Sequence, residues 1–252
     1  MKYCKDFNVL ENSRLNSSYI KLVLQSQDAI CPILAGQFVH LMTSKAPGVT
    51  LRRPFSVYDY DLEQHTISLV IQIVGKQTEY LSTIAKGETI NLEYPLGNNF
   101  PTESKKPLLV GGGIGMAPLY MLCKEFNERG IRPNIIIGAR TSKLLFALKE
   151  FEKIASLAIS TDDGSAGQKG IVTQNTTMQG DYDAMFCCGP TPMMKAVSQI
   201  AQQRDIDCYV SLEHKMACGI GACLCCVVDT TVGVKTSCIN GPVFLSKTLK
   251  EF

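Results

Sequence analysis

The sequence predicts a multi-domain protein in which an antiparallel β-barrel precedes a doubly wound α/β domain and a small C-terminal segment. Short runs rich in β-branched and aromatic residues fill the chain up to about residue 100, which favours a barrel. Strand-like and helix-like runs then alternate, which is typical of a parallel sheet covered by helices. From about residue 212 the chain is short and rich in cysteine. We therefore expect domains at residues 1–100, 101–211 and 212–252.

Five strands and one helix account for the predicted barrel. Each strand is a run of apolar and aromatic residues that turn residues separate from the next. The expected strands cover residues 19–25, 36–43, 53–61, 66–74 and 88–96, and the expected helix covers 78–85.

A polar stretch bounded by proline, NNFPTESKKP at 98–107, separates the barrel from the α/β domain as a linker. After it, each apolar run that resembles a strand is followed by a helical pattern or a turn. The expected strands are 107–113, 133–140, 157–164, 182–190 and 207–213, and the expected helices are 117–130, 144–155 and 191–205.

Composition and charge describe a soluble globular protein. Apolar residues make up 45% of the chain, charged residues 19%, and the net charge is +2, so no basic field points to nucleic acid. The first twenty residues contain no continuous apolar run, and the longest one, 108–123, is broken by glycines and is too short to cross a membrane. We therefore expect a cytoplasmic protein whose eleven cysteines do not form disulfides, which favours a metal or redox use for some of them.

The cysteine-rich segment has the ligand spacing of a plant-type [2Fe-2S] cluster. Cys218, Cys223 and Cys226 follow the pattern C-x4-C-x2-C, and Cys238 supplies a fourth thiolate further along. Thiolates are soft donors that suit iron, and the small residues between them let backbone N–H groups approach the sulfurs. Cys225 is a possible substitute for Cys226, but the plant-type spacing selects Cys226.

Two other interpretations apply to the cysteines. Four thiolates also bind structural zinc, although zinc sites usually contain paired C-x2-4-C units and this segment has one C-x2-C. The remaining cysteines show no ligand spacing and are better interpreted as small apolar residues in the core. They are Cys4, Cys31, Cys123, Cys187 and Cys208.

The stretch LRRPFSVYD at 51–59 is the first sign of a nucleotide. The guanidinium of Arg53 suits a pyrophosphate, and the Ser56 hydroxyl suits the edge of a ring. Thr78 is placed to cap the helix that follows, and helix N-termini bind phosphate. Alone this pattern is weak, because Arg53 is equally well explained as a surface residue.

Two turns of the α/β domain give the second sign. Glycines at 111–113 and at 115 stand between a strand and a helix, where they let backbone approach a phosphate, although Met116 replaces the last glycine of the strict dinucleotide fingerprint. A later strand ends in Cys188, Gly189 and Pro190, which places a thiol at the same crevice, where it could lie beside a nicotinamide. The alternatives are a tight turn without ligand and a packed cysteine at a strand end.

The order of these motifs resembles that of the ferredoxin reductase-like flavoproteins. RPFS in a barrel, GGGIG at the start of an α/β unit and CCGPTPMM occur in this order. With MACGIGACLCC appended, the whole chain resembles the electron-transfer subunits of NAD-linked dihydroorotate dehydrogenases of the B type. SLEHKMACGIGAC is the most specific part of the resemblance, and TDDGSAGQKGIVT at 161–173 is also similar.

The resemblance implies three cofactors, FAD, NAD and a [2Fe-2S] cluster, and a partner. FAD would contact Arg53, Pro54, Phe55, Ser56, Val70, Ile71, Gln72, Gln77 and Thr78. NAD would bind over Gly111, Gly112, Gly113 and Gly115 and near Cys188, Gly189 and Pro190. The cluster ligands would be Cys218, Cys223, Cys226 and Cys238, and the partner would be an FMN-containing catalytic subunit in a heterotetramer.

The chain departs from the family at two places. Gln77 stands where the family usually has glycine, which would alter a backbone contact with FAD. EYPLGNNF replaces the usual GPLGNGF, so Tyr94 and Asn99 would change the domain junction.

The resemblance implies an electron conduit for pyrimidine biosynthesis, from the partner's FMN through the cluster and FAD to NAD+. A related subunit that serves a hydrogenase or a sulfide dehydrogenase would bind the same cofactors, and a zinc-stabilised nucleotide-binding regulator is the alternative from another class. The residues leave NAD or NADP open, since Arg140 and Lys143 suit a 2′-phosphate and no ribose carboxylate is evident. His40, His65 and His214 are interpreted as structural, although His214 lies near the cluster segment.

Overall fold

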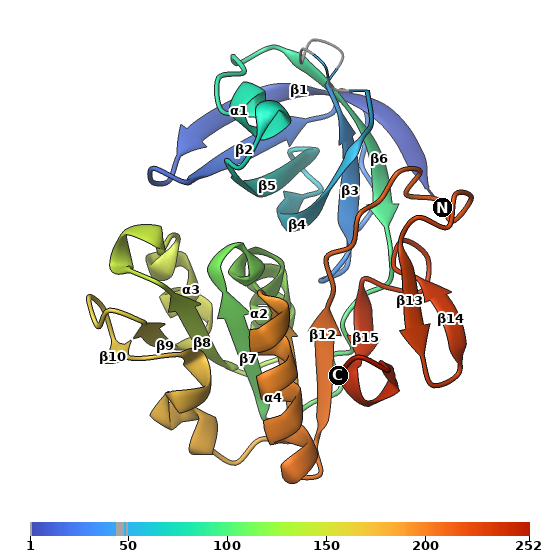
Figure 1. Ribbon diagram of the computed structural model, residues 1–252. Helices are drawn as coiled ribbons and strands as arrows, with labels where there is room; N and C mark the ends of the chain where they lie inside the picture. Colours follow the sequence, from blue (N-terminus) through green and yellow to red (C-terminus); the bar gives the residue numbers. More distant parts are fainter. Residues whose placement is uncertain (1, 44–47, 49) are drawn as a thin grey trace.

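The structure is a computed structural model that describes residues 2–43, 48 and 50–252. A closed barrel of six antiparallel strands lies above an α/β sheet in Figure 1, and the C-terminal segment runs along the side of both. The order around the barrel is β1-β2-β5-β4-β3-β6. The strands are β1 Tyr3–Arg14, β2 Tyr19–Gln25, β3 Phe38–Met42, β4 Arg53–Asp61, β5 Thr66–Gln72 and β6 Thr89–Leu96.

The five predicted barrel strands are confirmed, and β2 and β4 have the expected bounds. The sixth strand, β1, was not predicted, although its twelve residues make it the longest in the chain. It lies between β2 and β6 and closes the barrel. Its exposed positions include the charged Asp6, Glu11 and Arg14, which surround the buried Phe7 and Val9 and obscure the apolar face in the sequence.

The predicted helix at 78–85 is misplaced, because α1 spans Lys76–Leu81. Gly75 occupies the N-cap, and Thr78 lies inside the first turn, where its hydroxyl accepts the N–H groups of Val74 and Gly75. The helix ends early because the hydroxyls of Ser82 and Thr83 donate to carbonyls three residues back.

The α/β domain contains a seven-stranded sheet in the order β10-β9-β8-β7-β11-β12-β15. All neighbouring strands are parallel except β12 and β15. The strands are β7 Pro107–Gly112, β8 Asn134–Ala139, β9 Ser156–Thr161, β10 Gln168–Lys169, β11 Ala184–Cys188, β12 Asp207–Ser211 and β15 Val243–Leu245. The helices are α2 Ala117–Glu128, α3 Leu148–Ile154 and α4 Thr191–Gln203, so α3 begins four residues later than expected.

Both faces of this sheet are buried, as a doubly wound fold requires. Side chains alternate along β7, where Leu109 packs into the core shared with α2 and the barrel, while Leu108 and Val110 pack into the core beneath α4. The central strands therefore consist almost entirely of apolar residues, which is the pattern from which they were predicted.

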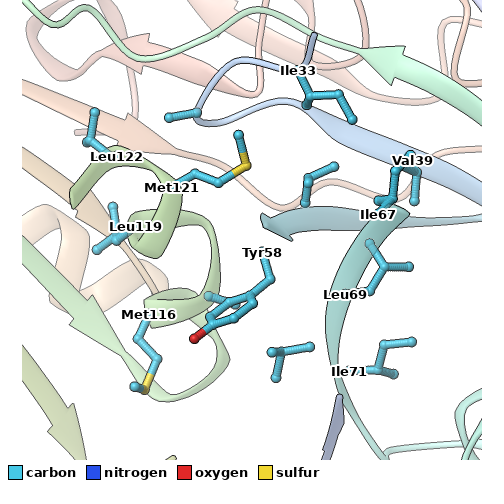
Figure 2. Packing of buried hydrophobic residues seen from close by; sticks show 14 of the residues in the cluster. Ile33, Val39, Tyr58, Ile67, Leu69, Ile71, Met116, Leu119, Met121 and Leu122 are labelled. Carbon is cyan, nitrogen blue, oxygen red and sulfur yellow. The ribbon is translucent and has the colours of Figure 1, made fainter. Parts of the chain in front are cut away.

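The barrel and the α/β domain share one hydrophobic core. Figure 2 shows Tyr58 of β4 projecting from the barrel toward Met116, at the beginning of α2. Tyr58 is fully buried, stacks on Tyr120 with 4.5 Å between ring centroids, and donates its hydroxyl to Glu150 at 2.6 Å. Burial and this carboxylate raise the pKa of Tyr58. This contact fixes the crevice between the two domains.

The C-terminal segment forms a hairpin of β13 Val227–Thr230 and β14 Gly233–Thr236, and then adds β15 to the edge of the large sheet. It is therefore joined to the α/β domain by backbone hydrogen bonds, which matters because about forty residues do not form an adequate core alone. No helix in the described part of the chain is long and apolar enough to cross a membrane.

Candidate functional site

A cavity of about 920 Å³ opens at the carboxyl ends of the parallel strands. Strand order reverses between β7 and β11, which makes this the switch point of the sheet, where open α/β sheets bind ligands. The volume lies within the range of ligand pockets. The lining that follows the sheet strands includes Gly112, Gly113, Gly138, Ala139, Ser160, Asp162, Gly189, Pro190, Leu212 and Glu213, and Tyr19 and Gln72 extend it to the barrel.

The predicted glycines divide into two groups. Gly112 and Gly113 line the cavity, and Gly113 has a φ of +56°, which glycine adopts readily. Gly111 and Gly115 lie outside the lining and are closely packed. A Cβ at Gly111 would lie 2.9 Å from Met116, and one at Gly115 would lie 2.3 Å from the carbonyl oxygen of Cys188. These two allow close packing of the turns that follow β7 and β11.

Cys188 is buried at the end of β11 and is absent from the cavity lining, whereas the next residues, Gly189 and Pro190, are part of it. Burial, together with the nearby Glu213 carboxylate, raises the pKa of the Cys188 thiol, so it stays protonated. Glu213 itself lines the cavity, and desolvation raises the pKa of its carboxyl.

The residues expected to contact FAD lie around one rim of the barrel, where β4 begins and β5 ends. The strands are antiparallel neighbours whose pairing ends at Val57 and Leu69, so residues 53–56 and 70–72 both extend from this end of the pair. Arg53 is exposed there and forms no ion pair in the described part of the chain; its guanidinium donates only to two backbone carbonyls. Gln72 lines the cavity, while Val70 and Ile71 have their side chains in the core.

Gln77 has a buried side chain with no partner. It is 6% exposed, and neither its amide oxygen nor its amide nitrogen has a hydrogen bond within the described residues. Burial of an unsatisfied amide is unfavourable, so the position suits a polar ligand that pairs with it. The barrel therefore carries an exposed guanidinium at the start of β4 and a buried amide without a partner at the start of α1.

The four predicted cluster cysteines are arranged as two pairs. The N–H of Cys223 donates to Cys218 Sγ at 3.4 Å, and Cys226 and Cys238 are buried together in one small core with Phe38 and Leu96 of the barrel. Across the described residues, no three side chains of the ligand-forming types gather around a single point. Two thiol pairs fit a cluster with two irons, each held by two cysteines.

The outer pair lies in a nest of backbone N–H groups. Desolvation raises the pKa of Cys218, but N–H groups of Ile220 and Cys223 outweigh it and lower this pKa to about 6. Burial and the neighbouring Cys226 raise the pKa of Cys238 to about 11. N–H donors directed at a sulfur stabilise negative charge there, which is what a cluster thiolate requires.

Cys225 differs from Cys226 in its surroundings. It is exposed, and its own contact in this loop is a backbone N–H that donates to Cys223 Sγ at 3.5 Å. Cys226 is 2% exposed and adjoins Cys238. The packing therefore favours Cys226 over Cys225 as the partner of Cys238.

Several cavity residues escaped the sequence analysis. Glu213 lies two residues beyond the end of β12, and its position after the carboxyl end of a parallel strand was the available signal. Asp162, which directly follows β9, was also missed and had the same signal. Tyr19 and the C-terminal Phe252 reach the cavity through tertiary packing, which no local pattern reports.

Comparison with known proteins agrees with this division of sites. Residues 7–100 match the family described as an oxidoreductase FAD-binding domain, and residues 213–250 match the iron-sulfur cluster binding domain of dihydroorotate dehydrogenase B. A structure reported as an NADH-dependent reduced ferredoxin-NADP oxidoreductase superimposes with a TM-score of 0.88 and 31% identity, over 97% of this chain and 89% of that chain. The cytochrome b5 reductase domain of Ulva prolifera nitrate reductase, at 15% identity and a TM-score of 0.69, covers 81% of this chain and 94% of its own and shares the fold.

Two curated relatives cover almost the whole chain. The dihydroorotate dehydrogenase B (NAD(+)) electron transfer subunit of Clostridium acetobutylicum is 40% identical over 96% of this chain and 95% of its own. The subunit of the same name from Fusobacterium nucleatum is 36% identical over 96% of both chains. A barrel of the FAD-binding type, a switch-point cavity and paired cysteines occur in one chain, which belongs to the family of electron-transfer subunits of dihydroorotate dehydrogenase B.

Proposed function

We propose that this chain transfers electrons from the FMN of a dihydroorotate-oxidising partner to NAD+, as a step of pyrimidine biosynthesis. The observation that carries the proposal is the register between β3 and β4. Phe38, which packs against Cys226 and Cys238, is the strand partner of Ser56, which we assign to FAD. The cluster segment and the flavin rim thus meet across one pair of barrel strands.

We assign FAD to the barrel, residues 1–100, NAD to residues 101–211 and the cluster to residues 212–252. Arg53 would hold the pyrophosphate, Ser56 the flavin ring, and Gln77 and Thr78 the beginning of α1. The exposed guanidinium and the unpaired Gln77 amide support this assignment. The backbone of Val70 and Ile71 and the side chain of Gln72 would complete the rim.

The nicotinamide cofactor would occupy the cavity at the switch point. Gly112, Gly113, Gly189 and Pro190 give it backbone to approach, while Gly111 and Gly115 hold the two turns together. Cys188 lies behind this wall as a protonated thiol, so it would support the turn of Gly189 and Pro190 instead of acting on the ring as a nucleophile.

Positioning is the principal task of the protein. The bound flavin supplies the chemistry that converts single electrons of an iron–sulfur cluster into the hydride that nicotinamide accepts. Cys218, Cys223, Cys226 and Cys238 would hold the cluster, with N–H groups of Ile220 and Cys223 directed at Cys218. The stacking of the buried Tyr58 on the half-buried Tyr120 would keep the barrel and the NAD-binding domain in fixed relation.

The partner would dock where the cluster loop reaches the surface. Four large apolar side chains are exposed around the cysteines, which is typical of an interaction site and unusual for a free surface. They are Ile220 at 53%, Leu224 at 63%, Val227 at 38% and Ile239 at 43%. A heterotetramer with two copies of each subunit is part of this proposal, as is a cytoplasmic location, since eleven free thiols suit a reducing compartment.

The test is a visible absorption spectrum of anaerobically purified protein, recorded before and after addition of NADH. Overlapping flavin and iron–sulfur bands that both bleach are expected, because electrons then pass from nicotinamide to both groups. Flavin bands alone, in protein reconstituted with iron and sulfide, would contradict the cysteine assignment. A protein that stays colourless after reconstitution with FAD and iron would contradict the whole proposal.

A further inference from the structure

His40 lies on the face of the barrel that supports the cysteine segment. Side chains alternate along β3, so Val39 and Leu41 belong to the barrel core while Phe38 and His40 face the other way. Phe38 packs against Cys226 and Cys238. His40, two residues further on, is fully buried beside the same segment.

The imidazole touches the cluster loop directly. A Cβ built at Gly219 would lie 2.6 Å from His40 Nδ1, closer than any real contact permits. Gly219 also has a φ of +68°, so both the close contact with His40 and the backbone conformation favour glycine at this position. Since Gly219 follows Cys218, the ring lies against the backbone that carries the first cluster cysteine.

Both ring nitrogens of His40 lack a hydrogen bond of good geometry to any residue the structure describes. The nearest carboxylate oxygen, Glu93 Oε2, lies 3.5 Å from Nδ1. Arg52 engages the other oxygen of Glu93 at 3.2 Å and donates to the His40 carbonyl at 3.1 Å. A buried imidazole whose Nε2 has no partner among the described residues is unfavourable, and an apolar residue would fill the space better if packing were its sole role.

We propose that His40 is a positioning residue for the [2Fe-2S] cluster. Its ring N–H would donate a hydrogen bond to a cluster sulfur on the side that Cys218 holds. Glu93 and Arg52 hold the ring in place from the strand beside it and from the loop before β4. Hydrogen bonds to cluster sulfurs stabilise the reduced form and raise its potential. The inference deepens the proposed function and rests on its assignment of the four cysteines.

The test compares His40→Leu with His40→Gln in the holoprotein, with His65→Asn as the control. His65 lies in the β4–β5 turn, away from the cysteines, and its φ of +54° suits asparagine. Iron content, the electron paramagnetic resonance signal of the reduced cluster and an anaerobic redox titration are measured. We expect His40→Leu to keep its iron while its one-electron equilibrium shifts at least tenfold toward the oxidised cluster, about 59 mV.

His40→Gln keeps an N–H donor and should recover part of that shift, while His65→Asn should match the unmodified protein. An unchanged potential in His40→Leu, or equal shifts in the leucine and glutamine variants, would overturn the inference. If His40→Leu loses its iron, His40→Met takes its place, because methionine adapts its shape to the cavity, and equal potentials for the methionine and glutamine variants would overturn the inference. An unmodified protein that never shows a cluster signal would instead refute the proposed function.

Discussion

Asn98 and Val243 exchange two hydrogen bonds across 145 residues of chain. Asn98 Nδ2 donates to the Val243 carbonyl at 2.8 Å, and its Oδ1 accepts the Val243 N–H at 3.0 Å. The same amide donates to the carbonyl of Asn240 at 3.0 Å. One side chain at the end of the barrel thus secures β15 and, through it, the cysteine segment.

Replacement of Asn98 by alanine should weaken this junction. The lost hydrogen bonds leave partly buried backbone groups unsatisfied, at a cost of about 1–3 kcal/mol in the free energy of unfolding. Urea denaturation measures the loss of stability. A faster release of iron would show that the weakened junction lies at the cysteine segment. Asn99→Ala is the matched control, because the Asn99 side chain bonds only to the neighbouring Phe100 carbonyl and should change stability by no more than about 0.5 kcal/mol. Equal losses in both variants would contradict the role assigned to Asn98.

Serine replacement should distinguish the two adjacent cysteines of the cluster loop. Cys226→Ser should lose the cluster absorbance and most of the iron, because Cys226 is buried beside Cys238. Cys225→Ser should keep about two irons per chain, since Cys225 faces solvent. Iron analysis and the visible spectrum after anaerobic reconstitution give the answer. The assignment is reversed if Cys225→Ser is the variant that loses iron.

The sequence predicted elements that have a local signal and missed those that depend on distant partners. The β2 and β4 strands were predicted residue by residue, because their apolar and aromatic runs end at turn residues. β15 has three residues and exists because β12 offers an edge. The helix at 78–85 was misplaced because the Thr78 hydroxyl bonds backward from inside the first turn, a geometry that the residue type alone does not reveal.

The candidate site shows the same limit. The four cysteines were visible as a spacing, and Gly112, Gly113 and Gly189 as turns. Gly111 and Gly115 have the same sequence signal but serve the packing of two turns, which only the tertiary structure distinguishes. His40 was interpreted as structural because its proximity to Gly219 joins residues that are far apart in the chain.

A charge among the four exposed apolar side chains around the cluster cysteines should weaken association with the catalytic partner. Ile220→Lys places an ammonium among these side chains. Loss of an apolar contact that is buried in an interface lowers affinity by roughly tenfold or more. The dissociation constant of the purified pair provides the measurement. Val232→Lys is the control, since Val232 is even more exposed than Ile220 but lies at the tip of the β13–β14 hairpin. A larger effect at Val232 would move the docking face to the hairpin.

Glu213 should make stability depend weakly on pH, because its side chain lines the cavity but is exposed there, so that solvent screens most of the effect. Desolvation raises its pKa above the ordinary value of 4.5, so its contribution is fully present below that value and is lost as the pH rises through the raised pKa. Glu213→Gln stays neutral, so the variant should become more stable relative to the unmodified protein as pH increases. Thermal unfolding at about pH 4 to 8 measures the difference. The exposed Glu63→Gln should follow the unmodified protein, and parallel curves for Glu213→Gln and Glu63→Gln would refute the effect.

Gln77→Leu should stabilise the flavin-free protein and weaken FAD binding at the same time. The Gln77 amide is buried without partners, so its removal relieves a desolvation cost of about 1–3 kcal/mol in the empty protein. In the loaded protein the same change removes a hydrogen bond to the cofactor, so the increase in thermal stability on FAD addition should shrink. Thermal unfolding of deflavinated and reconstituted samples measures both effects on one instrument. Leu81→Met, on the same buried face of α1, is the control for altered packing. A variant in which both forms gain or both forms lose stability would show that the amide serves the fold and not FAD.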